Sequence, residues 1–204
     1  MLEDGSVYEG TARGDFKETA CEIVFNTSMT GYVEILTDPS YAGQGVVMTY
    51  PMIGNYGISR EDFESERLQP SAFIVHELSS DPSNFRCTDT IENLLKEYNI
   101  PCISGVDTRA VVKKLRESGT MRGVLTSDIS DRERLMDVIK SFRQIDLVGS
   151  VTAKQTKVYG EENTGAEIAL MDFGTKRNII NNLVKRNCIV TVYPSFTSAD
   201  EIIK

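Results

Sequence analysis

The feature that most constrains this chain is the stretch EIALMDFGTKRNIINNLVKRNCIVTVYP at residues 167–194. It begins and ends with an apolar run, and each run predicts a strand. Between them, a glycine-bearing turn is followed by apolar residues at helical spacing, which predict a helix. Strands joined by such a helix lie parallel in a doubly wound sheet. Because two strands cannot bury both faces of that sheet, we expect this segment to begin a larger α/β domain. The stripe consists of Ile179, Ile180, Leu183 and Val184.

The last seven residues, SADEIIK, predict one more helix. Ser198 has the N-cap position and Glu201 the capping-box position. The sequence stops at Lys204, after about one helical turn. We therefore expect residues 166–204 to be an incomplete domain.

Residues 1–147 predict a separate domain that begins with strands and continues with helices. Short β-branched or aromatic runs such as CEIVFNTS and GQGVVMTYP are separated by Gly, Asn and Pro. Three helix patterns follow, with expected N-caps at Asp89, at Asp107 or Thr108, and at Ser130. Residues 148–165 lack periodicity, so we expect an interdomain linker there. The alternative is a long surface loop within one domain.

Composition and charge argue against several classes of protein. A net charge of −8 disfavours nucleic-acid binding through a basic face. No apolar run approaches the ~20 residues of a membrane span, and the acidic N-terminus is no secretory signal. We therefore expect a cytoplasmic protein that binds neither nucleic acid nor membrane. The cysteines are scattered, which predicts reduced thiols. With His76 as the single histidine and no clustered cysteines, we expect neither a metal site nor a Cys–His pair. The cysteines are Cys21, Cys87, Cys102 and Cys188.

The motif DFGTKRN contains the kinase-like triplet Asp172, Phe173 and Gly174. The glycine-rich loop, strand lysine and HRD loop of kinases are missing, so Gly174 more simply allows the strand-to-helix turn. Lys176 and Arg177 oppose the macrodipole of the following helix. A solvated helix start is the simplest interpretation, and facing an anion or a partner carboxylate is the alternative.

The densest polar stretch is FNTSMTGYVEILTDPSYAGQ. Glu34 and Asp38 are four residues apart, which in a helix would bring two carboxylates together for acid–base chemistry. Turn and cap chemistry is the simpler interpretation, with Pro39 setting the backbone of the turn. The residues alone contain no complete catalytic constellation.

Six stretches, in this order, resemble one known family: LEDGSVYEG, EIVFNTSMTGYVEILTDPSYAGQ, TYPMIGNYGI, SNFR, GVDTRAVVKKLRESG and MDFGTKRNII. They are similar to the small, glutaminase-bearing chain of carbamoyl-phosphate synthase. The resemblance covers nearly the whole chain and implies an α/β fold of two domains. A swivelling β/β/α domain would precede the first β-α-β-α of a flavodoxin-like class I glutamine amidotransferase domain.

The resemblance also implies a function. The small chain of this family hydrolyses L-glutamine and passes ammonia through a tunnel to a large chain, which binds ATP and Mg. The complex is a ligase that makes carbamoyl phosphate for arginine and pyrimidine biosynthesis. The small chain itself would carry no cofactor. The alternative is a non-catalytic docking module that binds the large chain.

Particular residues acquire roles from the resemblance. Ser40 matches the serine that contacts glutamine, and its hydroxyl can both donate and accept. Ser28, Met29 and Lys176 match positions near the first part of the ammonia tunnel, at a domain junction. The catalytic Cys, His and Glu of the family would lie beyond Lys204, so we expect no catalytic residue here and no activity of this chain alone.

Overall fold

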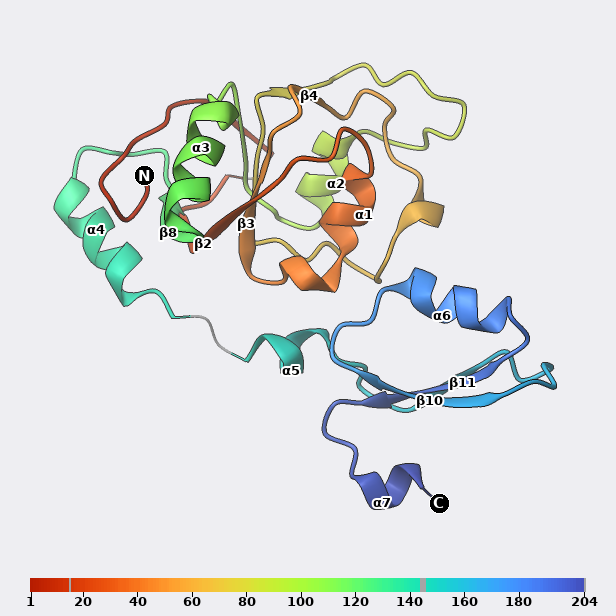
Figure 1. The fold of residues 1–204 in the computed structure, drawn as a ribbon. Coiled ribbons are helices and arrows are strands. Elements are labelled where there is room, and N and C mark those ends of the chain that lie inside the picture. Colours follow the sequence, from red (N-terminus) through yellow and green to blue (C-terminus); the bar gives the residue numbers. More distant parts are fainter. Residues whose placement is uncertain (15, 144–145, 204) are drawn as a thin grey trace.

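The computed structural model describes residues 1–14, 16–143 and 146–203, so Lys204 lies outside the described residues. A six-stranded and a three-stranded sheet organise the chain, beside a small two-stranded sheet (Figure 1). We call residues 1–143 the N-terminal part and residues 146–203 the C-terminal part. The architecture is mixed α/β, as the sequence predicts.

The sheet of the N-terminal part has six strands in the order β1-β7-β5-β3-β2-β8. The four inner strands, β7, β5, β3 and β2, run parallel to one another. The edge strands β1 and β8 pair antiparallel with β7 and β2. Both faces of the inner strands are covered, which explains their nearly continuous apolar sequence. The strands are β1 (Thr11–Arg13), β2 (Thr19–Asn26), β3 (Gln44–Met48), β5 (Ala72–Ile74), β7 (Cys102–Ser104) and β8 (Met121–Leu125).

Helices cover this sheet from two sides (Figure 1). On one side α1 (Tyr32–Thr37) and α2 (Ile91–Glu97) bury a large apolar core with β3 and β5. On the other side α3 (Thr108–Ser118) packs on β2 and β3, and α4 (Arg132–Ser141) packs on β8. The remaining elements are the 3₁₀ turns η1 (Pro39–Tyr41) and η2 (Arg60–Asp62) and the parallel pair β4 (Met52–Ile53) and β6 (Glu77–Leu78).

The helix starts test the predicted caps. Asp107 caps α3 by accepting the backbone N–H three residues on, at 3.0 Å, which confirms that prediction. The prediction for α2 is wrong, because Thr90 is the N-cap and Asp89 instead accepts the N–H of Thr90. The prediction for α4 is also wrong, because Asp131 and not Ser130 is the N-cap. In both errors a second cap-forming residue adjoins the predicted one, and only the backbone conformation decides between them.

The C-terminal part contains the predicted strand–helix–strand unit. Strands β10 (Glu167–Asp172) and β11 (Ile189–Pro194) are parallel, and α6 (Arg177–Val184) connects them. One face of the sheet packs against α6, which lies on the side toward the N-terminal part in Figure 1. The last helix is α7 (Ala199–Ile202), where the Glu201 carboxylate accepts from the backbone N–H and hydroxyl of Ser198. The predicted capping-box contact is therefore present.

The expected linker, residues 148–165, contains regular structure. It includes most of α5 (Leu147–Val151) and all of β9 (Lys157–Tyr159). Strand β9 pairs antiparallel with β11, so this segment supplies an edge strand to the second sheet. A three-residue strand gives too little alternation to be detected by pattern, and pairing with β11 defines it.

Candidate functional site at the seam

The two parts meet at a seam formed by residues 38–41 and 64 of the N-terminal part and residues 174–178 of the C-terminal part. Gly174 has a φ of +100°, and a Cβ at this position would lie 3.0 Å from Cβ of Pro39. A side chain at residue 174 would therefore be strained and would crowd the turn that follows Asp38. The glycine serves both the strand-to-helix turn and the close approach of the two parts.

Asp38 is the central side chain of the seam. It is 6% exposed, and it precedes the 3₁₀ turn η1 as its N-cap. One carboxylate oxygen, Oδ1, accepts the backbone N–H of Ser40 at 2.9 Å. The other, Oδ2, lies 2.7 Å from Nζ of Lys176. A single carboxylate therefore shapes the Ser40 turn and binds the C-terminal part to it.

Lys176 is the N-cap of α6. The hydrogen bond to Asp38 raises the pKa of the Lys176 ammonium group, and the charges of Asp38, Glu64 and Tyr41 act in the same direction against a smaller effect of burial. The group therefore stays positively charged at neutral pH. Of the two interpretations of this lysine, the structure supports a partner carboxylate and not a simply solvated helix start.

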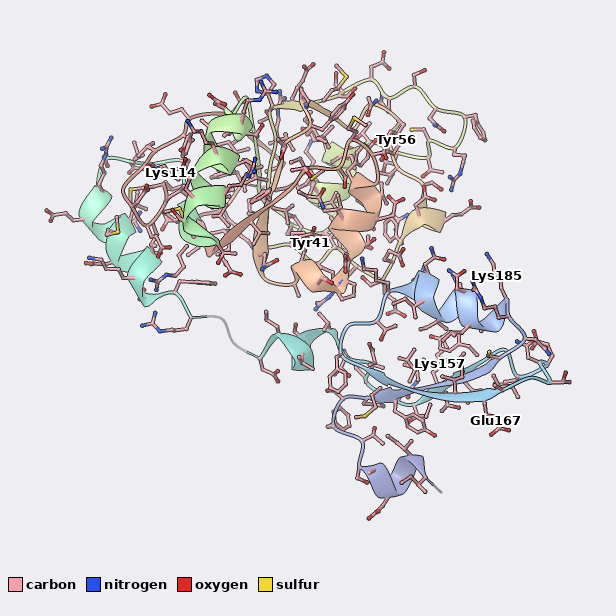
Figure 2. The ribbon with its side chains drawn as sticks, in the orientation of Figure 1. Tyr41, Tyr56, Lys114, Lys157, Glu167 and Lys185 are labelled. Carbon is pink, nitrogen blue, oxygen red and sulfur yellow. The ribbon has the colours of Figure 1, made fainter. Side chains whose placement is uncertain are left out.

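The loop that carries Ser28 is connected to the same place by one side chain. Oδ1 of Asn26 accepts the backbone N–H of Ser28 at 2.7 Å, and Nδ2 of Asn26 donates to the Tyr41 hydroxyl at 2.9 Å. Figure 2 labels Tyr41. Tyr41 follows Ser40 directly in η1. Hydrogen bonds thus connect the Ser28 loop to the Ser40 turn, and that turn to Lys176.

Three of the predicted site residues, Ser28, Met29 and Ser40, are exposed. Ser40 is exposed beside the seam. Met29 is 68% exposed, on the loop just after Ser28. The Ser28 loop is therefore connected to the Ser40 turn through Asn26 and Tyr41, and that turn is connected to Lys176 through Asp38. Among the described residues, no hydrogen bond joins the Met29 side chain to this cluster.

Glu34 and Asp38 do not form a carboxylate pair. Asp38 binds Lys176, whereas Glu34 lines a separate pocket of about 340 Å³ with Tyr56 and Arg86. Burial raises the pKa of the Glu34 carboxyl, and nearby acidic side chains add to the effect. The turn and cap interpretation of this stretch is the one that fits Asp38.

Asp172, the first residue of the kinase-like triplet, is a structural acceptor. Its Oδ1 accepts the backbone N–H groups of Gly174 and Thr175 at 3.0 and 2.7 Å. Its Oδ2 accepts the N–H of Ala153 at 2.7 Å, and its carbonyl accepts the Thr152 hydroxyl at 2.6 Å. This nearly buried residue joins the end of β10 to the end of α5. Sequence reasoning missed it, although an aspartate before a glycine turn is a known turn-forming signal.

The cysteines are free thiols, and two of them are buried. Burial raises the pKa of the Cys21 and Cys102 thiols to about 12, so thiolate is scarce at neutral pH. A ring nitrogen of His76 lies 3.1 Å from the carbonyl oxygen of Val106. Within residues 1–14, 16–143 and 146–203, no group of three or more His, Cys, Asp and Glu side chains could hold a metal ion. Over the same residues, no helix is long and apolar enough to cross a membrane.

The fold and the seam define a class: a two-part α/β protein with a polar candidate site where the parts meet. Comparison with known proteins then gives the family. The family model "Carbamoyl-phosphate synthase small chain, CPSase domain" matches residues 1–125. The chain belongs to the carbamoyl-phosphate synthase small chain family.

Three relatives illustrate the similarity, and each is named carbamoyl phosphate synthase small chain. The protein of Clostridium perfringens is 47% identical over 205 residues, which cover 100% of this chain and 58% of the relative. That of Listeria monocytogenes is 44% identical, covering 100% and 56%. That of Archaeoglobus fulgidus is 46% identical, covering 98% and 57%. The chain spans a little over half the length of these relatives.

Proposed function

We propose that this chain serves glutamine-dependent carbamoyl phosphate synthesis in the cytoplasm. It would contribute the N-terminal domain and the beginning of a flavodoxin-like amidotransferase domain to a small chain that releases ammonia from L-glutamine. A large chain would use this ammonia, with ATP and Mg, to make carbamoyl phosphate for arginine and pyrimidine biosynthesis. The observation that carries the proposal is the meeting of Ser40 and Lys176 at one buried carboxylate, in a chain of this family.

Ser40 would form one wall of the glutamine site. Its backbone N–H is occupied by Asp38, which fixes the turn and leaves the hydroxyl of this exposed residue to meet a ligand. A hydroxyl can donate to a carboxylate or carbonyl oxygen and accept from an ammonium group, so it suits an amino acid. The role in this proposal is binding and orientation of the substrate.

Lys176 would line the route of ammonia away from that site. Its raised pKa keeps it protonated, so it neither takes a proton from the substrate nor attracts ammonium. Ser28 and Met29 would belong to the same route, on the loop held by Asn26. Neutral ammonia could pass these groups, whereas a cation would be repelled by Lys176.

The chain alone is expected to be inactive. Glutamine hydrolysis by an amidotransferase needs a cysteine thiolate beside a histidine base. The buried thiols of Cys21 and Cys102 hold their protons, whereas Cys87 and Cys188 lie against backbone carbonyls and His76 faces the carbonyl of Val106. Incubating the 204-residue chain with glutamine should therefore release no ammonia. Release of ammonia that is blocked by a thiol reagent would contradict this expectation.

A docking module that binds the large chain without catalysis is the second candidate. The side chain of Phe85 is 95% exposed and that of Met29 is 68% exposed, and exposed large apolar groups favour protein contacts. The two candidates differ in the source of nitrogen: a glutaminase chain makes glutamine usable, whereas a docking module leaves synthesis dependent on added ammonia.

The experiment uses the protein as its gene encodes it, assembled with a carbamoyl-phosphate synthase large chain. Ser40→Ala should raise KM for glutamine about 10-fold, the effect of one lost hydrogen bond, and leave ammonia-dependent synthesis unchanged. Ser80→Ala, an exposed serine on another loop, is the control and should change neither. If the wild-type assembly uses ammonia but not glutamine, the glutaminase proposal fails and the docking module is favoured.

A further inference from the structure

Helix α6 receives its N-terminal cap from the other part of the molecule. The first N–H groups of a helix lack acceptors within the helix and need one from outside. Lys176, the N-cap residue, makes no side-chain cap hydrogen bond. The acceptor is Glu64: its carbonyl oxygen accepts the N–H of Arg177 at 2.7 Å, and its carboxylate Oε2 accepts the N–H of Asn178 at 2.9 Å.

Glu64 is itself held in place by the N-terminal part. Its backbone N–H donates to the Thr37 hydroxyl at 2.9 Å, and Thr37 in turn donates to the carbonyl of Val33 at 2.8 Å. Thr37 is fully buried at the end of α1 and directly precedes Asp38. The group that caps α6 and the group that binds Lys176 are therefore anchored at the same rigid point.

Two attachments of different kinds act on α6 at this point. The ion pair between Lys176 and Asp38 joins two side chains, so by itself it would allow the helix to pivot. The cap contacts are made to backbone N–H groups that point along the helix axis, and the negative carboxylate also complements the helix dipole. Together they define both the distance and the direction of α6.

We infer that Glu64 is a positioning residue that caps α6 across the seam and holds Lys176 against Asp38. Any effect of Glu64 on glutamine binding rests on the proposed function, because Lys176 and Ser40 belong to the proposed site. The cap itself is a property of the chain. It can be tested without substrate, so failure of one idea does not imply failure of the other.

Two variants separate the acceptor from the charge. Glu64→Asp keeps the charge but shortens the side chain by one methylene, which withdraws the acceptor from the N–H of Asn178. Glu64→Gln removes the charge but keeps an oxygen at the same reach. Glu66→Ala removes an exposed carboxylate from the same loop and is the matched control.

The first readout is hydrogen exchange of backbone amides in the 204-residue chain. Glu64→Asp should speed exchange of the Asn178 amide about 10-fold, the usual effect of a lost cap. Glu64→Gln and Glu66→Ala should stay within about 3-fold of wild type. The amide of Arg177, bound to the Glu64 backbone, should remain protected in every variant, which excludes general unfolding. Unchanged exchange of Asn178 in Glu64→Asp would overturn the cap.

The second readout is the pKa of Lys176, followed by NMR of its side-chain nitrogen. If Glu64 positions this lysine, Glu64→Asp should lower its pKa toward the ordinary value although the charge of residue 64 is kept. Glu64→Gln should change it only by the lost charge. A pKa that depends on the charge of residue 64 alone, and not on its reach, would overturn the positioning role.

Discussion

The two parts of this molecule solve the problem of stability differently. The N-terminal part covers a six-stranded sheet with helices and buries side chains such as Phe73, Leu94 and Leu115 completely. In the described C-terminal part, the hydrophobic core contains three buried side chains, Ile180, Val190 and Val192. Because stability from burial grows with the core, the small part must depend more on polar contacts and on its neighbour. The comparison predicts where each kind of substitution will act.

The largest effect should come from the large core. Leu94→Ala removes a fully buried side chain and should lower the free energy of unfolding of the N-terminal part by ~2–5 kcal/mol. Val190→Ala should cost about 2 kcal/mol and act on the C-terminal part. Urea denaturation followed by hydrogen exchange of each sheet checks this. If both variants shift one common unfolding transition equally, the two parts unfold as a single cooperative unit, and the proposed difference in their stability is wrong.

The next largest effect should come from a polar residue of the small part. Asp172→Ala would leave the N–H groups of Gly174, Thr175 and Ala153 without their carboxylate acceptor. We expect a loss of ~1–3 kcal/mol, with faster amide exchange confined to residues 152–175. Asp200→Ala, which alters an exposed residue of α7, is the control. Equal effects of the two variants would show that the small part does not depend on this polar junction.

A smaller effect is expected at the seam. Lys176→Met should cost at most ~1 kcal/mol, because the lysine is half exposed and solvent screens the pair. Lys185→Met, at the other end of α6, should cost nothing measurable (Figure 2). Because folding raises the pKa of Lys176, its contribution is complete below the ordinary value of 10.5 and is lost as pH rises through the raised value. The difference in stability between wild type and Lys176→Met should therefore be complete at pH 7 and should shrink as the pH rises above 10.5.

The smallest effect concerns a surface pair of the N-terminal part. Hydrogen bonds from Arg134 lower the pKa of Glu18 from 4.5 to about 2, with a further contribution from Thr126. A lowered carboxyl pKa stabilises the fold above pH 4.5, and this contribution disappears as pH falls toward 2. Glu18→Gln should remove that acid sensitivity, and Glu133→Gln should not. If the stability of the two variants depended on acidic pH in the same way, Glu18 would not be the source of the acid sensitivity.

Much of the fold could be predicted because its signals are local. The unit β10–α6–β11 follows from apolar spacing, and Asp107 follows from the ordinary preference for Asp at a helix start. Helix α1 was missed, since its six residues lie in a stretch dominated by turn-forming side chains. Strand β9 was missed because only its partner, β11, makes it a strand. Local pattern fails where a distant contact defines the element.

The site could be predicted in part. The resemblance pointed to Ser40 and Lys176, but residue patterns could not say that Asp38 joins them, because the two ends of this contact are far apart in the sequence. A lysine placed against the helix dipole did suggest a partner carboxylate. Glu64 gave no such signal, since its role depends on where the second part lies.

Strand β9 also has a consequence for the order of events during synthesis. It precedes β10 in the chain, yet its only described pairing is with β11, which begins about 30 residues later. At ribosomal rates of ~5–20 residues per second, β9 therefore waits roughly 2–6 s for its partner to be made. The N-terminal sheet is complete before this interval begins, so the nascent chain carries a finished domain followed by a strand that waits to be paired.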